Sequence, residues 1–269
     1  MVATLESCLA QIQGNAKELC AGAGDPELVH RLRVGLRRMR TALRELTNFG
    51  PAFDPTWEEV LRETFQALGT HRDVETVIPA MVKEMNAAGI RYSAESKLPI
   101  VTRSSQAIVR DVDFQRTVFA IVSYCHLTAD SMANGEPRPK SLRARLARQL
   151  EALHAALARD AVRFSKLSPA RQHRVRKRLK RLRYLAEFAT PVFDPARVSK
   201  YLESWGKAQD ALGEHNDHRI AQAFVRADKR TGVHAPSALR WLTERLRVGA
   251  KRCERTLRRA VRQPAFWDA

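Results

Sequence analysis

The sequence has few cysteines, and none of them lies in a pattern typical of metal sites or disulfide frameworks. Cys8, Cys20, Cys125 and Cys253 are scattered over 269 residues without a CxxC or Cys/His spacing. Scattered cysteines in a chain of this length are typical of a reducing cytoplasm, and zinc sites need clustered ligands. We therefore expect a cytoplasmic protein without a metal site.

Long apolar runs are also absent. No stretch is apolar enough to span a bilayer, and Met1 leads into a polar, acidic start rather than into a signal peptide. We expect no membrane partner.

The sequence lacks the motifs of the common nucleotide-binding and hydrolytic enzymes. It contains no GxxxxGKS/T, GxSxG or HExxH, and its basic helix faces offer only one carboxylate, Glu187. Phosphoryl transfer usually needs carboxylates that hold Mg²⁺ and position water. We expect no enzyme activity, no catalytic residue and no cofactor.

Strand patterns are missing as well, which predicts an all-α fold. All twelve prolines fall at or near helix ends and loops apart from Pro79, and the short apolar stretch Lys97–Val101 is expected to be a loop. The segment 133–139, with Gly135, Pro137 and Pro139, is the best linker. Helices are expected at about 2–21, 26–47, 55–68, 73–88, 105–131, 141–164, 169–189, 195–212, 217–231 and 236–262.

Positive charge is abundant and unevenly distributed. The net charge is +18, yet residues 1–135 contain 15 Lys and Arg against 16 Asp and Glu, whereas residues 136–269 contain 32 against 13. Such an excess favours a polyanionic partner.

The stretch Val29–Leu46 shows how the charge is arranged. On a helix, its histidine and four arginines fall within an arc of about 80°, beside an apolar stripe of about the same width. Like charges three and four residues apart destabilise a helix by roughly 0.2–0.5 kcal/mol per pair, so local stability does not explain this column. An anion that binds the column from outside the helix would explain it. The column consists of His30, Arg33, Arg37, Arg40 and Arg44.

A second copy of this design follows 143 positions later, which indicates an internal duplication. His173, Arg176, Lys180 and Arg183 correspond to the first four members of the column, and Arg181 corresponds to Arg38. Glu187 stands where the first copy has Arg44, so the inner end of the second column departs from the pattern. The sequences LGTHRD, from Leu68, and LGEHND, from Leu212, also correspond, and we expect both to be turns.

The spacings HxxRxxxRRxR from His30 and HxxRxxxKRLRY from His173, each followed by LGxxxD, resemble the CHAD domain, an all-helical family named for its histidines. The resemblance covers essentially the whole chain. It implies two four-helix bundles, formed by repeats at about 1–134 and 135–269 and related by a pseudo-twofold axis. It further implies a basic channel between them that binds inorganic polyphosphate, and possible association with polyphosphate granules.

Arginine suits this ligand because its planar fork holds two phosphate oxygens and stays charged. His30 and His173 could donate to phosphate oxygens, although a packing role is the alternative. His71 and His215 could equally be capping or surface residues, whereas Arg72 matches the family's turn. The helix at 236–262 adds a basic face without a counterpart in the first repeat. The candidate site comprises His30, Arg33, Arg37, Arg38, Arg40, Arg44, Arg72, His173, Arg176, Lys180, Arg181, Arg183, Arg247, Lys251, Arg255 and Arg258.

Two alternatives to polyphosphate binding stay open. A basic helical protein also binds nucleic acid nonspecifically, but Tyr184 is the sole aromatic expected close to a basic column, so a base-stacking platform is not evident. The other alternative is a scaffold that recruits proteins to polyphosphate, which would need an exposed apolar patch.

Overall fold

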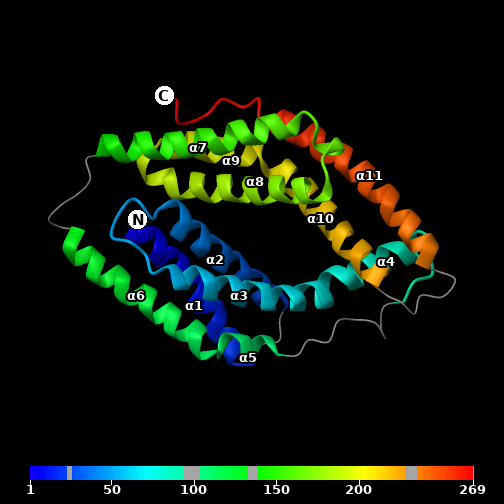
Figure 1. The fold of residues 1–269 in the computed structure, drawn as a ribbon, viewed down its shortest axis with the longest axis horizontal. Coiled ribbons are helices and arrows are strands. Elements are labelled where there is room, and N and C mark those ends of the chain that lie inside the picture. The colour runs from blue at the N-terminus through cyan, green and yellow to red at the C-terminus, as the bar shows by residue number, and fades with distance from the viewer. Residues whose placement is uncertain (23–25, 94–102, 133–138, 228–234, 269) are drawn as a thin grey trace. The chain divides into compact units, whose positions relative to one another are not determined.

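A computed structural model of the chain describes residues 1–22, 26–93, 103–132, 139–227 and 235–268. Within these residues every regular element is a helix, which confirms the all-α prediction (Figure 1). The chain forms two compact units. Unit 1 comprises residues 1–76 and 99–138, and unit 2 comprises residues 77–98 and 139–269. A segment of the first predicted repeat therefore belongs to the unit formed mainly by the second.

Four long helices of unit 1 close into a ring, because α1 contacts α2, α2 contacts α3, α3 contacts α6 and α6 contacts α1. Their apolar stripes meet inside the ring, where Leu5, Leu36, Leu61 and Phe114 are fully buried. The elements of unit 1 are α1 (Val2–Cys20), α2 (Pro26–Glu45), α3 (Pro55–Arg72), α5 (Ser105–Val109) and α6 (Val112–Met132).

Unit 2 contains a ring of the same order, in which α7, α8, α10 and α11 each contact the next and α11 contacts α7. An additional helix, α4, packs against α10. The elements are α4 (Ile78–Ala87), α7 (Pro139–Ala161), η2 (Phe164–Lys166), α8 (Pro169–Ala189), η3 (Thr190–Val192), α9 (Pro195–Ser204), α10 (Gly206–Ala227) and α11 (Ala235–Ala260).

The two Phe-Asp-Pro sequences start helices as predicted. Asp54 accepts a hydrogen bond from the Thr56 backbone N–H at 2.8 Å, and Asp194 accepts one from the Ala196 N–H at 2.8 Å. In each case a proline follows at the first helical position, where its missing N–H costs nothing. Asp25, expected to cap α2, lies outside the described residues, as do the stretch Lys97–Val101 and the linker up to Pro139.

The prediction that the two LG sequences form turns is wrong. Gly69 lies inside α3, which continues through the π-helical turn η1 (Asp73–Val77) into α4, and Gly213 lies in the middle of α10. Glycine costs about 1 kcal/mol in a helix interior relative to alanine, and packing of the flanking stripes outweighs this cost. The π turn directly precedes Pro79, whose ring removes a helical hydrogen bond.

Two other helix ends were not predicted. The helix expected at 105–131 is divided into α5 and α6, because the Asp111 carboxylate accepts from the backbone N–H groups of Asp113 (3.1 Å) and Phe114 (3.4 Å) and caps α6. The helix expected at 195–212 ends at Ser204, whose hydroxyl donates to the Tyr201 carbonyl at 2.6 Å and competes with the helical pattern.

Helix α6 also departs from expectation at its surface. Its middle, Val118–Cys125, was expected to be well buried, and Val118, Ile121 and Cys125 are. Phe119, however, is 66% exposed and Leu127 is 73% exposed. Periodicity finds the buried stripe of this helix but does not reveal that apolar residues continue around its outer side.

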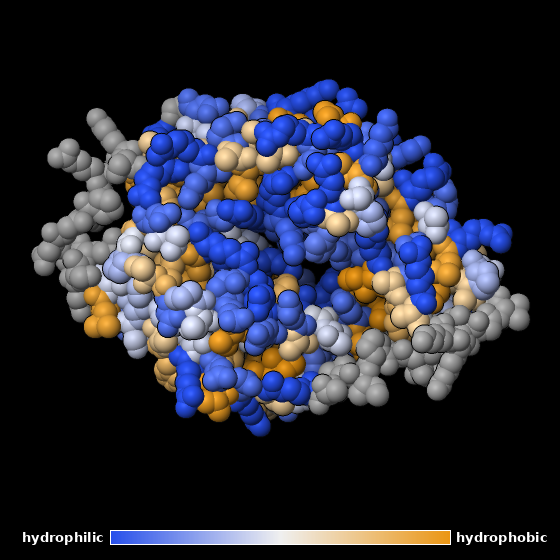
Figure 2. Space-filling view, in the orientation of Figure 1, coloured by the Kyte–Doolittle hydropathy of each residue, from blue (hydrophilic) through white to orange (hydrophobic). Residues whose placement is uncertain are grey.

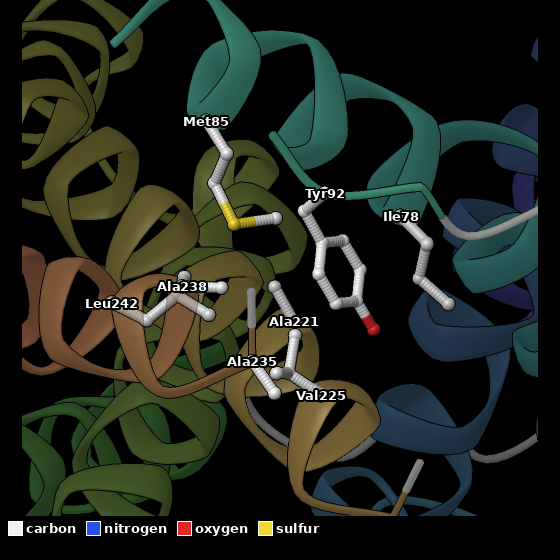
Figure 3. Packing of buried hydrophobic residues seen from close by; sticks show 8 residues of the cluster. All are labelled: Ile78, Met85, Tyr92, Ala221, Val225, Ala235, Ala238 and Leu242. Carbon is white, nitrogen blue, oxygen red and sulfur yellow. The ribbon is translucent and has the colours of Figure 1, made fainter. Parts of the chain in front are cut away.

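The docking of α4 in unit 2 depends on a small apolar cluster (Figure 3). Met85 and Tyr92 approach α10 and α11 where those helices present the small side chains of Ala221, Ala235 and Ala238. Small residues allow the long Met85 side chain to fill the space between the helices. The remaining members of the cluster are Ile78, Val225 and Leu242.

Met85→Ala should lower the free energy of unfolding of the whole chain by about 2–5 kcal/mol, because it removes a 1%-exposed side chain and leaves a cavity between α4 and α10. Lys83→Ala, at an exposed position of the same helix, is the control and should change it by less than about 0.5 kcal/mol. Urea denaturation followed by circular dichroism measures both. Equal stabilities would show that α4 does not pack on unit 2.

Candidate polyanion-binding site

Hydrophilic side chains are widespread on the face of the molecule seen in Figure 2, between smaller apolar areas. Unit 1 carries the predicted column on α2. His30 and Arg44 at its ends are exposed, and Arg33, Arg37 and Arg40 between them are half-buried. The adjoining side of α2 is held in the core by Leu32, Leu36 and Met39, which are fully buried. The column is thus fixed in place by the burial of the helix that carries it.

Phe65 on the neighbouring helix α3 lies beneath three arginines of the column. The guanidinium carbons of Arg33, Arg37 and Arg40 are 4.2, 4.7 and 5.6 Å from its ring centroid. A cation near the face of an aromatic ring is stabilised by about 0.5–1 kcal/mol at an exposed site and more when desolvated. The Phe65 carbonyl also accepts a hydrogen bond from Arg33 Nη1 at 2.7 Å. Phe65 therefore holds the three guanidinium groups close together, although their like charges repel one another.

The sequence predicted Tyr184 as the sole aromatic close to a basic column. That prediction is wrong for α2, where Phe65 lies beside the column. The contact joins residues of two different helices, 32 positions apart for Arg33, so no spacing within one helix reveals it. The signal that could have found it is that Phe65 lies on α3, the helix that follows α2 in the ring.

Gly69 explains how Arg33 reaches this position. A Cβ atom at Gly69 would lie 2.6 Å from Arg33 Nη1, closer than any non-bonded contact allows. The absence of a side chain at Gly69 thus allows the Arg33 guanidinium group to approach α3, and Gly69 does not form a turn. At Gly213, the corresponding position of α10, a Cβ atom would meet nothing within 4 Å.

A carboxylate from another helix neutralises part of the first column. Glu58 on α3 pairs with Arg40, at 2.7 Å from Nη2, and with Arg44. Burial would raise the pKa of Glu58, but hydrogen bonds from Arg44 and Arg40 together lower it below its usual value. The pKa of Arg40 is lowered by burial, against which Glu58 acts. Together, Arg40, Arg44 and Glu58 carry a net charge of about +1.

Of the other predicted residues of unit 1, Arg38 lies away from the column. Arg38 Nη1 donates to Gln11 Oε1 at 3.0 Å, so it lies on the α1 side of α2, whereas the column lies on the α3 side. Arg72 is half-buried at the end of α3, with Nη1 3.7 Å from Asp73. His71 is not a surface residue: it is 5% exposed, and its Nε2 lies 2.7 Å from the Arg103 carbonyl oxygen, to which it can donate.

In unit 2 the column on α8 repeats the exposure pattern of α2. His173 is exposed, and Arg176, Lys180 and Arg183 are half-buried. Arg183 donates from Nη1 to the side-chain amide of Gln209 on α10. Its partner is therefore neutral, whereas the partner of Arg40 in unit 1 is the carboxylate of Glu58. Arg181 is exposed.

A cavity of about 730 Å³ adjoins the His173 end of this column. Two further cations line it, Arg219 and Arg226 on α10, which the sequence analysis did not identify. Their spacing of seven residues places both on one face of α10, and this spacing was the available signal. Burial and then the charge of Arg226 lower the pKa of Arg219. The other lining residues are Asn216, Ile220, Gln222, Ala223 and Ala227.

His215 is a buried structural residue rather than a capping or surface one. Its Nε2 lies 3.1 Å from Gln172 Oε1, which also accepts from Arg219 at 2.8 Å, while Gln172 Nε2 donates to the Phe164 carbonyl. His215 therefore donates from Nε2. Burial, followed by the charges of Arg219 and His218, lowers its pKa to about 4, which favours the neutral ring with Nδ1 unprotonated.

The predicted residues of α11 do not join the α8 column. In the ring of unit 2, α11 contacts α10 and α7, so α8 and α11 occupy opposite corners (Figure 1). Arg247, Lys251, Arg255 and Arg258 are all exposed, and Arg247 bonds to Glu244 on its own helix at 2.6 and 2.8 Å.

Within the described residues, no group of three or more His, Cys, Asp or Glu side chains could hold a metal ion. The four cysteines are free, and burial raises the pKa of Cys125 to about 11 and that of Cys253 to about 12. No helix in the described part of the chain has the length and apolar character needed to cross a bilayer.

These observations define an all-helical protein with two basic columns, each on the second long helix of a ring of four. The CHAD domain family model matches residues 3–226, and the chain belongs to the CHAD domain family.

Solved structures share this fold. The crystal structure of the CHAD domain from the plant Ricinus communis is 22% identical with a TM-score of 0.69, and the similarity covers 93% of this chain and 90% of that chain. PptA from Streptomyces chartreusis is 18% identical with a TM-score of 0.54, and the similarity covers 97% and 99%. The comparison with curated proteins gives no match.

Gly213→Ala should raise the free energy of unfolding by about 0.5–1 kcal/mol, because alanine favours the helix and its methyl group enters open space. Gly69→Ala should gain less or lose stability, because the methyl group displaces Arg33 from the Phe65 carbonyl. Urea denaturation of the two variants measures the difference. An equal gain at both positions would contradict the close approach of Arg33.

The pH dependence of stability should report on His215. A histidine whose pKa is lower in the folded state stabilises the fold fully above its unfolded pKa of about 6.5 and loses this contribution as pH falls toward about 4. Between pH 7 and pH 5 the loss should be about 2 kcal/mol. His215→Gln, which cannot titrate, should lose correspondingly less over the same range. Parallel pH profiles of the two proteins would contradict a buried neutral His215.

Proposed function

We propose that this chain binds inorganic polyphosphate through the columns on α2 and α8, as the CHAD resemblance implies. The observation that carries the proposal is the row of Arg33, Arg37 and Arg40 held over Phe65. Packing three guanidinium groups side by side is unfavourable unless an anion compensates for their repulsion. A chain of phosphates supplies negative charges at short intervals along such a row.

The geometry of the donors supports phosphate. A guanidinium group presents N–H donors in a planar fork that matches two oxygens of one phosphate. Successive members of the α2 column are three or four residues apart, which corresponds to about 4.5–6 Å along the helix axis. Several neighbouring phosphates of one chain could therefore be held by successive side chains. His30 and His173, at exposed ends of the columns, would donate to phosphate oxygens.

The proposal includes the two-repeat organisation predicted from the sequence. Its support is that each unit closes a ring of four long helices in the same chain order, with a basic column on the second. The expected channel concerns the arrangement of the repeats and stays a prediction. We further propose a binding role without catalysis, for a cytoplasmic protein that can associate with polyphosphate granules.

Arg37→Ala combined with Lys180→Ala should weaken binding of long-chain polyphosphate by at least about tenfold, because one donor is lost from the middle of each column. Thermal unfolding should remain nearly unchanged, since both positions are half-buried and lie outside the core. Isothermal titration calorimetry at about 50 and 200 mM salt measures affinity and its salt dependence, which should be shallower in the variant.

The matched control is Arg116→Ala combined with Arg159→Ala, which removes one exposed charge from each unit away from the columns. It should change the affinity by less than about threefold. An affinity that falls equally in both double variants would mean that net charge, rather than the columns, determines binding. Competition separates the nucleic-acid alternative: polyphosphate should displace a DNA oligonucleotide from the columns, and DNA should not displace polyphosphate.

A further inference from the structure

Helix α11 carries a second row of cations. All its members are exposed, and those on the helix extend over 18 residues, or about 27 Å of helix axis. From Arg247 to Arg258, consecutive cations are separated by about 4.5–6 Å along the axis. The row consists of Arg240, Arg247, Lys251, Arg255 and Arg258, and Arg262 follows two residues after the end of the helix.

Contacts on both flanks of α11 show that this row faces away from the ring of unit 2. On one flank Arg252 Nη1 pairs with Glu214 of α10 at 2.5 Å. On the other flank Glu254 accepts from the backbone N–H of Ser165 at 2.9 Å and from its hydroxyl at 2.6 Å. Leu246, Cys253 and Leu257 form the buried side. The row lies between the two flanks, opposite the core.

The row is separate from the polyphosphate column of the same unit. Because α8 and α11 occupy opposite corners of the ring formed by α7, α8, α10 and α11, their outer surfaces face different directions. The family model matches residues 3–226, which do not include α11.

Little negative charge compensates the row. Arg247 pairs with Glu244, whose pKa is lowered by the hydrogen bond from Arg247. Within the described residues, no carboxylate forms an ion pair with Lys251, Arg255 or Arg258. Glu244 and Glu254 also interact electrostatically with Lys251 and Arg258, so these two carboxylates offset part of the charge and the row keeps a net positive charge.

We propose that this row is a second binding surface and that its ligand is the phosphate backbone of double-stranded nucleic acid. The row is straight, rigid and on the convex side of a helix. A flexible phosphate chain would lose conformational entropy on lying along it, whereas a duplex already holds its phosphates in a rigid array. One negative charge per about 1.7 Å of duplex axis supplies partners along the whole row.

The side chains around the row favour a duplex over two other polyanions. No aromatic residue belongs to the row, so single strands find no stacking platform there. Of the residues on the outer side of α11, only Val248, 49% exposed, is a large exposed hydrophobic, whereas helices that bind membrane surfaces insert several apolar side chains. Contacts limited to phosphates would make the binding independent of base sequence.

The test uses the full chain and a fluorescent DNA duplex of about 24 base pairs, which is rigid at this length. Lys251→Ala, Arg255→Ala and Arg258→Ala together should weaken duplex binding by at least about tenfold at 100 mM salt and lower the slope of log affinity against log salt by about 2–3. Its affinity for polyphosphate should fall much less than its affinity for the duplex, because the columns on α2 and α8 keep all their cations. A charge-matched triple variant, Arg62→Ala, Arg116→Ala and Arg159→Ala, should lose less than about threefold in duplex affinity. All six positions are exposed or half-exposed, and thermal unfolding verifies that each variant folds.

Three outcomes would overturn the inference. The first is unchanged duplex affinity of the α11 variant. The second is an equal loss of duplex affinity when Arg176, Lys180 and Arg183 of α8 are replaced by alanine, because one surface would then serve both ligands. The third is that the α11 variant no longer binds phosphatidylserine vesicles but still binds the duplex. Failure of the polyphosphate proposal is distinguishable, because it is judged by the column variants and by polyphosphate affinity alone.

Discussion

Repulsion between cations on one helix face is the constraint on which the candidate site depends. A row such as Arg33, Arg37 and Arg40 disfavours the helix that carries it, so the row needs support from outside that helix. Burial of the apolar side of α2 provides most of this support, as it does for helices in general. Phe65 and its carbonyl hold the guanidinium groups in the row, and Glu58 compensates charge at one end. The site is a consequence of packing between α2 and α3.

The two columns meet this constraint differently. In unit 1 an aromatic ring and a carboxylate approach the column from α3, whereas in unit 2 the amide of Gln209 approaches from α10 and Glu187 takes the position of Arg44. The carboxylate of the second column, Glu187, therefore comes from α8 itself, four residues after Arg183, whereas that of the first column, Glu58, comes from α3. Both columns keep a net positive charge.

The sequence was sufficient for the helices, their buried stripes and the two columns, because these depend on periodicity within one segment. It was misleading at Gly69 and Gly213, where a local preference of glycine suggested turns and the packing of the whole helix prevails. Phe65 and Glu58 could not be assigned to the site from spacing alone, because each contacts the column from another helix. The attachment of α4 to unit 2 likewise depends on apolar contacts between residues more than 130 positions apart.

The helices at corresponding positions of the two rings have different outer surfaces. The packing of the core therefore does not determine the chemistry of the outer surface. Helix α6 closes the ring of unit 1 and α11 closes that of unit 2, and both bury an apolar stripe. Outside the stripe, α6 exposes Phe119 and Leu127 and has no charged residue from 117 to 129, whereas α11 exposes a row of arginines. Both surfaces are compatible with the same fold, since neither touches the core. The chemistry of each is therefore free to follow what the surface contacts, which is why the row on α11 calls for a partner of its own.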